Sequence, residues 1–250
     1  MNAHISTLNG VARCSRYAFG PNKLNMCGPD ESRELSAYLR EGATDQGLVD
    51  MLKEFKTLHP YLRAIAKANH IQDPFDERVV EAYWIGNELL EAIPQKTFYA
   101  HLVDNLGLKK KASSRDFDEL TAKLPQGARM HHSFHVFNVY KRTGHMEILH
   151  TLESMDACRV SWGRVTLIDG PSVTVMRKPL ILEGHQLALG PEQRYVINRT
   201  LDDNDVFDEV KIGDWVTVHW DRACEIVNQS AVRMLERYTL QHIVLANQTL

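Results

Sequence analysis

The sequence has no long apolar run, no excess of basic charge and few cysteines. Nowhere in its 250 residues does an apolar run approach the roughly 18 residues of a membrane-spanning helix. The N-terminal stretch is interrupted by His4, Arg13 and Arg16, and it lacks the apolar centre of a signal peptide. The formal net charge is −3, which gives no electrostatic reason to bind nucleic acid or an anionic membrane. We therefore expect a cytoplasmic protein whose partners are neither membranes nor nucleic acids.

Several catalytic motifs are also missing. The sequence contains neither a glycine-rich phosphate loop nor a dinucleotide-binding fingerprint, which argues against nucleotide-driven chemistry. No serine, histidine and aspartate lie at a spacing that indicates a catalytic triad. The side chains that stand out are twelve histidines and four cysteines, the residue types that bind soft and borderline metals. Without an export signal, the cysteines are expected to be thiols rather than a disulfide framework.

The first part of the chain, up to about residue 155, has the apolar spacing of helices. Asp30 is a suitable N-cap for a helix that begins at residue 31, and Asp73 followed by Pro74 is a typical helix start. Pro60 is expected to break a long helical stretch. We predict helices from residue 31, over 45–69 with a break at Pro60, over 73–92, and near 96–106 and 114–123, with a solvated loop at 109–111.

After about residue 157 the period changes to short β-type runs. Asp169-Gly170-Pro171 and Ile212-Gly213-Asp214 are strong turn signals between them. Many short strands at close spacing favour a small barrel. The fold class we expect is α+β, with an all-α domain over 1–155 and an OB-like β-barrel domain over 156–250. Strands are predicted near 160–168, 173–175, 179–182, 186–189, 194–198 and 215–219, and a terminal helix near 228–246.

Two stretches of this second part carry a family resemblance. In the first, Cys158 is followed five residues later by Gly163 and then, after a short strand, by Asp169-Gly170. The second reads Ile212-Gly213-x-Trp215-Val216-x-Val218-His219. In order and spacing these stretches resemble the HypC/HupF family of nickel–iron hydrogenase maturation chaperones, which are small barrels that begin with a cysteine. The resemblance covers roughly residues 157–245, with a longer middle section than is usual in the family.

The resemblance implies a scaffold or carrier for an iron fragment that bears cyanide and carbon monoxide ligands. It also implies partners, namely the hydrogenase large-subunit precursor and other maturation proteins. The functional cysteine and histidine of the family correspond to Cys158 and His219. This chain departs from the family because a whole domain precedes Cys158, because Trp162 replaces a usual proline, and because Trp-Asp follows His219. The alternative to a metal role is that Cys158 is a buried core thiol at the start of a strand and that His219 lies at a strand end and hydrogen-bonds the backbone.

The first part of the chain has metal-ligand candidates of its own. His131, His132 and His135 lie close in sequence, and on either a helix or a strand His131 and His135 share a face. No glutamate lies within this spacing, so a zinc protease motif is absent. Two imidazoles on one face can bind zinc or iron if a third ligand joins them. The plainer alternative is a polar segment start with one histidine hydrogen-bonded internally.

Cys27 is a further candidate, in a stretch with Gly-Pro and Cys-Gly-Pro turns just before the helix expected from residue 31. This place favours a thiolate because a helix N-terminus stabilises negative charge. The alternative is an incidental cysteine in a tight loop.

Two other functions of the whole protein stay open. One is a metal-dependent enzyme that acts on a small molecule with its site in the helical domain, and the other is a structural adaptor without metal chemistry.

Overall fold

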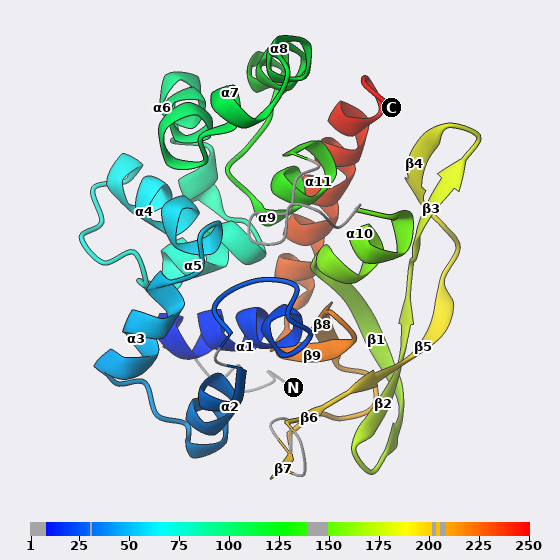
Figure 1. The fold of residues 1–250 in the computed structure, drawn as a ribbon. Coiled ribbons are helices and arrows are strands. Elements are labelled where there is room, and N and C mark those ends of the chain that lie inside the picture. The colour runs from blue at the N-terminus through cyan, green and yellow to red at the C-terminus, as the bar shows by residue number, and fades with distance from the viewer. Residues whose placement is uncertain (1–8, 31, 140–149, 202–203, 206–208) are drawn as a thin grey trace.

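Helices occupy the first part of the chain and strands most of the second, so the fold is mixed α+β with a helix at its C-terminal end (Figure 1). The computed structural model describes residues 9–30, 32–139, 150–201, 204–205 and 209–250. Along these residues, no helix combines the length and the apolar character needed to cross a lipid bilayer. The mixed class predicted from the change of periodicity is confirmed.

The part before residue 159 forms short helices, several of them extended or replaced by 3-10 or π-helical turns. They are α1 (Gly10–Lys23), α2 (Ser32–Glu41), α3 (Gln46–Lys53), α4 (Leu58–Ala68), α5 (Glu77–Trp84), η1 (Glu88–Leu90), α6 (Gln95–Ala100), η2 (His101–Asn105), α7 (Leu108–Lys111), α8 (Ser114–Ala122), η3 (Leu124–Gln126), α9 (His132–Phe134), η4 (His135–Val139) and α10 (Leu152–Cys158).

The helix expected over 73–92 is shorter than predicted. It is α5, which begins after Asp76 and ends at Trp84. Asp76 and not Asp73 is the cap, because its carboxylate accepts a hydrogen bond of 3.0 Å from a backbone N–H of the first turn. Gly86 then adopts a φ of +99°, a left-handed conformation that ends helices. Gly86 therefore helps to end α5, which the spacing of apolar residues alone does not predict.

Three further boundaries differ from the prediction. α1 continues through Gly20 and Pro21, where turns were expected. The predicted loop at 109–111 is solvated, but it lies in the helix α7. The break in the 45–69 stretch precedes Pro60, which lies in the first turn of α4, where a missing backbone N–H is tolerated.

The strands after residue 160 form a ring of five with two small two-stranded additions. They are β1 (Ser161–Asp169), β2 (Ser172–Arg177), β3 (Leu180–Glu183), β4 (Gln186–Leu189), β5 (Gln193–Asn198), β6 (Thr200–Leu201), β7 (Asn204–Asp205), β8 (Trp215–His219) and β9 (Arg222–Val227), followed by α11 (Gln229–Ala246). The strand order is β1-β2-β5-β9-β8, and β8 pairs again with β1. The β5–β9 contact is a single parallel pair, Asn198 with Arg222, while the other four contacts are antiparallel.

The predicted strands and the terminal helix are confirmed, but the short strands β6 and β7 were not predicted, and two further differences concern β9 and Cys158. Strand β9 was not predicted, because its polar and charged residues hide the alternation. Cys158, expected at a strand start, is instead the last residue of helix α10, three residues before β1. Its side chain therefore projects from a helix end toward the helical part of the molecule rather than from the sheet.

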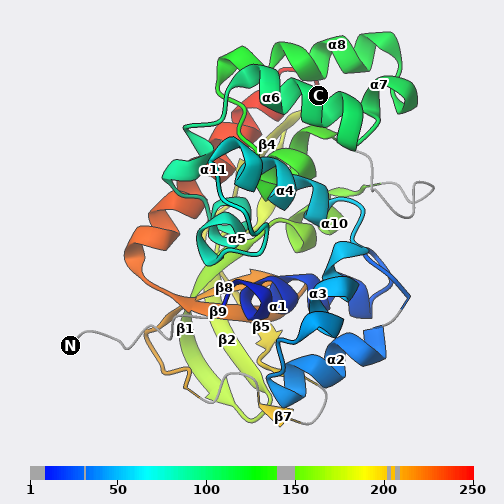
Figure 2. The ribbon, with the colours of Figure 1, turned by 90° about the vertical axis from the view of Figure 1, so that its left-hand side faces the viewer.

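The helical and strand segments share the main hydrophobic cluster, and the ring of strands has a separate cluster that includes Val173, Val175 and Val216. The main cluster of buried residues runs from Val11 in α1 to Leu245 in α11 and includes Trp162 and Cys224 from the strands. Figure 2 shows α1 lying against β8 and β9, and contacts between these elements confirm it. At this contact the Tyr17 hydroxyl donates to the Glu225 carboxylate at 2.7 Å, and the Arg13 guanidinium pairs with the same carboxylate at 3.0 Å. The division into domains at residue 155 stays a prediction.

Candidate metal centre

Three side chains from different elements meet in the interior of the protein. They are His132 at the start of α9, Cys158 at the end of α10 and His219 at the end of β8. One nitrogen or sulfur ligand atom from each lies within 4.8 Å of the others. Both histidines are buried and Cys158 is half-buried. The two residues picked out by the family resemblance are therefore neighbours, and one histidine of the 131–135 group joins them.

His219 has the proton arrangement that a metal ligand needs. Its Nδ1 lies 2.7 Å from the Tyr17 carbonyl oxygen, and because a carbonyl only accepts, Nδ1 carries the hydrogen. Burial lowers the pKa of His219 to about 4, so the imidazole is neutral and Nε2 bears a lone pair. Nε2 is buried and has no hydrogen-bond partner among the described residues. A buried acceptor without a partner costs about 1–3 kcal/mol, and a metal ion bound to Nε2 would offset this cost.

His132 is held between the thiol residue and a tyrosine. Its Nε2 donates to the Cys158 carbonyl at 2.8 Å and lies 4.0 Å from the Cys158 sulfur. Its Nδ1 lies 3.1 Å from the Tyr83 hydroxyl. Burial and the nearby His219 lower the pKa of His132 well below the usual range, so this imidazole is also neutral. Because the Tyr83 hydroxyl can accept as well as donate, the proton of His132 can move to Nδ1 and leave Nε2 free for a metal.

Cys158 is fixed by an ion network on either side of it in sequence. Asp156 pairs with Arg159 and with Arg177, both at 2.8 Å, and it accepts the Leu180 N–H at 2.8 Å. The two guanidinium groups are almost fully buried, at 1% and 5% side-chain exposure. This network ties the end of α10 to β2 and β3. The position of the thiol therefore depends on charged groups that do not themselves face the centre.

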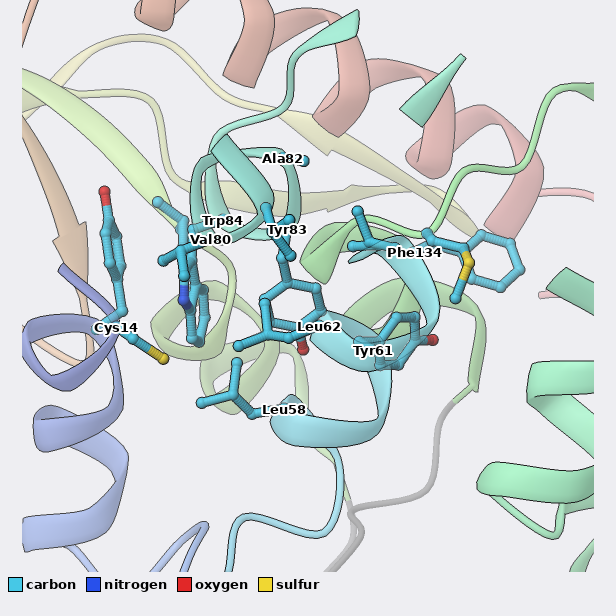
Figure 3. Packing of buried hydrophobic residues seen from close by; sticks show 14 of the residues in the cluster. Cys14, Leu58, Tyr61, Leu62, Val80, Ala82, Tyr83, Trp84 and Phe134 are labelled. Atoms are coloured by element: carbon cyan, nitrogen blue, oxygen red, sulfur yellow. The ribbon is translucent and has the colours of Figure 1, made fainter. Parts of the chain in front are cut away.

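Two aromatic residues of α5, Tyr83 and Trp84, contact the histidines of the centre, whose own ring centres lie 5.2 Å apart. The Trp84 ring lies 4.5 Å from the ring centre of His132 and 5.3 Å from that of His219. Tyr83 lies on the adjacent side and holds His132 through its hydroxyl. Figure 3 shows Tyr83 and Trp84 next to one another, with Cys14 and Leu58 nearby. The apolar periodicity of a helix places Tyr83 on the buried face but does not show what its hydroxyl binds. The contact of Tyr83 with His132 was therefore not predictable from the spacing.

The turn after His219 carries backbone strain. Trp220 and Asp221 have φ values of +50° and +56°, as the two central residues of a type I′ hairpin turn do. A tryptophan in this region is rare, and such outliers concentrate at functional sites. The Trp220 N–H donates to the Ala157 carbonyl at 2.8 Å, next to Cys158 in sequence. This hydrogen bond connects the turn after the His219 strand to the helix that carries Cys158.

The three side chains open into a pocket with an empty volume of about 680 Å³, part of it open to solvent. Its described lining is mostly apolar or aromatic, and none of its residues is a lysine, arginine, aspartate or glutamate. Cys27 and His135 also line it, so five of the six predicted ligand candidates share one pocket. The lining residues are Ala18, Pro21, Met26, Cys27, Phe55, Thr57, Leu58, Tyr83, Trp84, His132, His135, Val136, His150, Cys158, His219 and Trp220.

His131 and His135 do not share a site, although both a helix and a strand would place them on one face. His131 is the N-cap of α9, and its Nδ1 accepts from the Ser133 N–H at 3.1 Å. The Ser133 hydroxyl links it to His242 of α11. His135 begins the π-helical turn η4, and its Nδ1 is buried without a partner among the described residues. The alternative of an internally bonded histidine therefore describes His131, while His132 and His135 face the pocket.

The donor set fits a metal ion of borderline or soft character. A thiolate and two imidazoles are ligands that zinc and iron accept. Metal bonds of about 2.3 Å to sulfur and 2.1 Å to nitrogen span the 4.0 Å between the Cys158 sulfur and His132 Nε2. The Tyr17 carbonyl and the Tyr83 hydroxyl act on the far nitrogens, as outer partners of metal-bound histidines do. Three donors leave room for further ligands.

Comparison with known proteins places the chain in a family. The family model described as "Family of unknown function (DUF6390)" matches residues 6–250, and the chain belongs to this family. No curated protein and no solved structure matches the chain.

Proposed function

We propose that this DUF6390 protein is an accessory protein of nickel–iron hydrogenase maturation that works in the cytoplasm. Its role in this proposal is to hold an iron fragment with cyanide and carbon monoxide ligands as cargo. Cys158 and His219 are the ligands that the family resemblance suggests, and His132 is a third donor from the helical segment. The acceptor is the hydrogenase large-subunit precursor, which the protein also chaperones, together with other maturation proteins.

One observation carries the proposal. Cys158 and His219 are separated by 61 positions in the sequence, and the resemblance was the only reason to pair them. Their side chains converge within 4.8 Å of one another and of His132. The five-stranded ring on which His219 lies also has the strand number of a small OB-like barrel, the architecture that the resemblance implies. Both points agree with what the resemblance implies and therefore support the proposal.

The chemistry of the pocket suits a carrier. A thiolate donates strongly to iron, and neutral imidazoles add no charge, so diatomic ligands can complete the coordination sphere. The apolar lining limits the access of water to the iron fragment. Because His132 comes from α9 and Cys158 from α10, a small shift of either helix opens the set of donors for release.

Infrared spectroscopy of the protein made under strict anaerobiosis tests the proposal. The protein is purified after co-production with the hydrogenase maturation proteins, alongside Cys158→Ala and a matched variant of a cysteine outside the pocket, Cys224→Ala. We expect cyanide and carbonyl stretching bands in the wild type and in Cys224→Ala, and their loss in Cys158→Ala. Wild-type protein without such bands, or bands that persist in Cys158→Ala, would contradict the carrier role.

A further inference from the structure

A groove separate from the metal pocket lies where α4 faces α6 and η2, both of which it contacts (Figure 1). Its empty volume is about 2110 Å³, part of it open to solvent. Enclosed small-molecule sites have about 300–1,000 Å³, so this groove is too open to surround a small molecule. None of its described lining residues also lines the metal pocket. The groove is therefore a second site, and its form suits a segment of polypeptide.

The groove is positively charged, although the whole chain has a net charge of −3. Arg63 and Lys67 of α4 and Lys96 of α6 line it, and Asp104 is the one carboxylate among its described lining residues. All three cationic side chains are exposed, and none forms an ion pair with a carboxylate in the part of the chain that the structure describes. Arg63 and Lys67 are four residues apart on one helix face, where like charges repel one another. An anionic partner would remove this repulsion and is attracted by the field of the groove.

His70 lines the groove in a backbone conformation that glycine adopts more easily. It follows Asn69, the C-cap of α4, and has a φ of +58°. The Ile71 N–H donates to the Ala66 carbonyl at 2.9 Å, which is the hydrogen bond of a Schellman motif around His70. Glycine is the usual residue at such a helix end, because a side chain in the left-handed region costs conformational energy. The exposed imidazole of His70 is thus kept at a cost in stability, which indicates a use for this side chain in the groove.

The rest of the lining favours a polypeptide over a nucleic acid. No phenylalanine, tyrosine or tryptophan is among the described lining residues, so the groove offers none of the aromatic rings on which bases of single strands stack. Pro60, Pro74, Pro94 and Ile71 supply apolar surface between the charged side chains. Apolar contacts combined with scattered cations match a chain that alternates acidic and small or apolar residues.

We propose that this groove is the docking site for an acidic segment of a partner protein. Carboxylates of the segment pair with Arg63, Lys67 and Lys96, and the His70 imidazole hydrogen-bonds the segment beside them. This inference goes beyond the proposed function, because the docking needs no metal. The helix α4 also contributes Leu58 to the lining of the metal pocket, so a docked partner lies one helix away from the centre.

Fluorescence anisotropy with a labelled peptide of alternating glutamate and serine tests the docking. The full-length chain is titrated into the peptide at low ionic strength, where exposed charges are least screened. We expect Arg63→Glu/Lys67→Glu to bind the peptide at least about tenfold more weakly than the wild type. Lys109→Glu/Lys110→Glu is the matched control, because it changes the net charge equally at exposed residues of α7 outside the groove, and it should bind within about twofold of the wild type. His70→Gly should unfold at a higher urea concentration and yet bind the peptide about threefold more weakly.

Several results would overturn the inference. It fails if the wild type binds the glutamate peptide no more tightly than the same peptide with glutamine, or if both double variants lose affinity equally. Tighter binding of a uridine oligonucleotide of equal charge would assign the groove to nucleic acid instead. A more stable His70→Gly with unchanged affinity would show that the role of His70 is wrong.

Carbodiimide coupling of the bound peptide locates the contact without a variant. It joins peptide carboxylates to lysine amines, and mass spectrometry should find the peptide on Lys67 and Lys96. Coupling confined to residues 109–111 would contradict the docking site. Iron binding by Arg63→Glu/Lys67→Glu should equal that of the wild type, so a failure of the docking proposal is distinct from a failure of the metal centre.

Discussion

Replacing Asp156 by alanine removes the carboxylate on which two buried guanidinium groups depend. Arg159 and Arg177 have side-chain exposures of 1% and 5%, and both pair with Asp156 at 2.8 Å. Removing one partner of a buried ion pair costs about 3–5 kcal/mol, because the remaining charge stays buried without compensation. Asp156 keeps 13% exposure, so we expect the lower end, about 3 kcal/mol. For a chain of this size that corresponds to a melting temperature lowered by about 6–12 °C.

Urea unfolding followed by circular dichroism measures this loss. The matched control is Asp50→Ala, since Asp50 pairs with Lys53 at 2.8 Å on the surface, with side-chain exposures of 60% and 42%. Such an exposed pair contributes little to stability, because solvent and salt screen it. Because the network holds the end of α10, Asp156→Ala should also weaken metal binding at Cys158. A loss of less than about 1 kcal/mol in Asp156→Ala, equal to that in Asp50→Ala, would refute the argument.

Two further predictions concern the buried histidines and the close packing of α1 against the end of β8. Burial lowers the pKa of His101 and of His131 to about 3 and that of His242 well below its usual value, whereas in the unfolded chain each titrates near about 6.5. The unfolded state then binds more protons below that pH, so the free energy of unfolding should fall as pH drops from 7 to 5, by about 2 kcal/mol in all for each such histidine, with a slope that approaches about 1.4 kcal/mol per pH unit only below about pH 6. A flat profile in urea titrations at several pH values would contradict this prediction. Gly20→Ala would place a Cβ 2.9 Å from the His219 carbonyl oxygen and 3.1 Å from the Trp220 Cβ, so we expect a loss of about 1–3 kcal/mol in urea unfolding together with weaker metal binding. Gly42→Ala is its control, because a Cβ there meets no atom within 4 Å and the change tests only a left-handed backbone. If Gly20→Ala and Gly42→Ala weaken metal binding equally, a specific contact between α1 and the His219 strand is contradicted.

The sequence allowed the local elements to be predicted where side-chain periodicity is strong. Strand β2 alternates between buried and half-buried residues along its whole length, and α11 begins after its capping Asn228, as expected. The errors lie where single residues override periodicity. Asp76 rather than Asp73 caps α5, and Gly86 ends it early. Strand β9 carries the buried Glu225, whose pairing with Arg13 and Tyr17 of α1 is a tertiary contact that no local pattern shows.

The ligands of the candidate centre were predictable as residue types, but their grouping was not. Cys158 and His219 could be paired by resemblance, and His132 was one of three neighbouring histidines. Which of those three lies next to Cys158 depends on the cap at His131 and on contacts with α11. The roles of Tyr83 and of the Tyr17 carbonyl depend on how distant elements pack. A backbone carbonyl that fixes a histidine tautomer has no sequence signature at all.

Equilibrium dialysis against iron(II) under anaerobic conditions tests the central claim, that His132, Cys158 and His219 form one metal centre. We expect one iron per chain in the wild type and at least about a tenfold loss of affinity in each of His132→Ala, Cys158→Ala and His219→Ala, about 1.4 kcal/mol or more. His131→Ala should retain the iron, because His131 bonds Ser133 and lies outside the pocket lining. Iron that is lost in His131→Ala but kept in Cys158→Ala would contradict the account and place the metal in the helical segment alone.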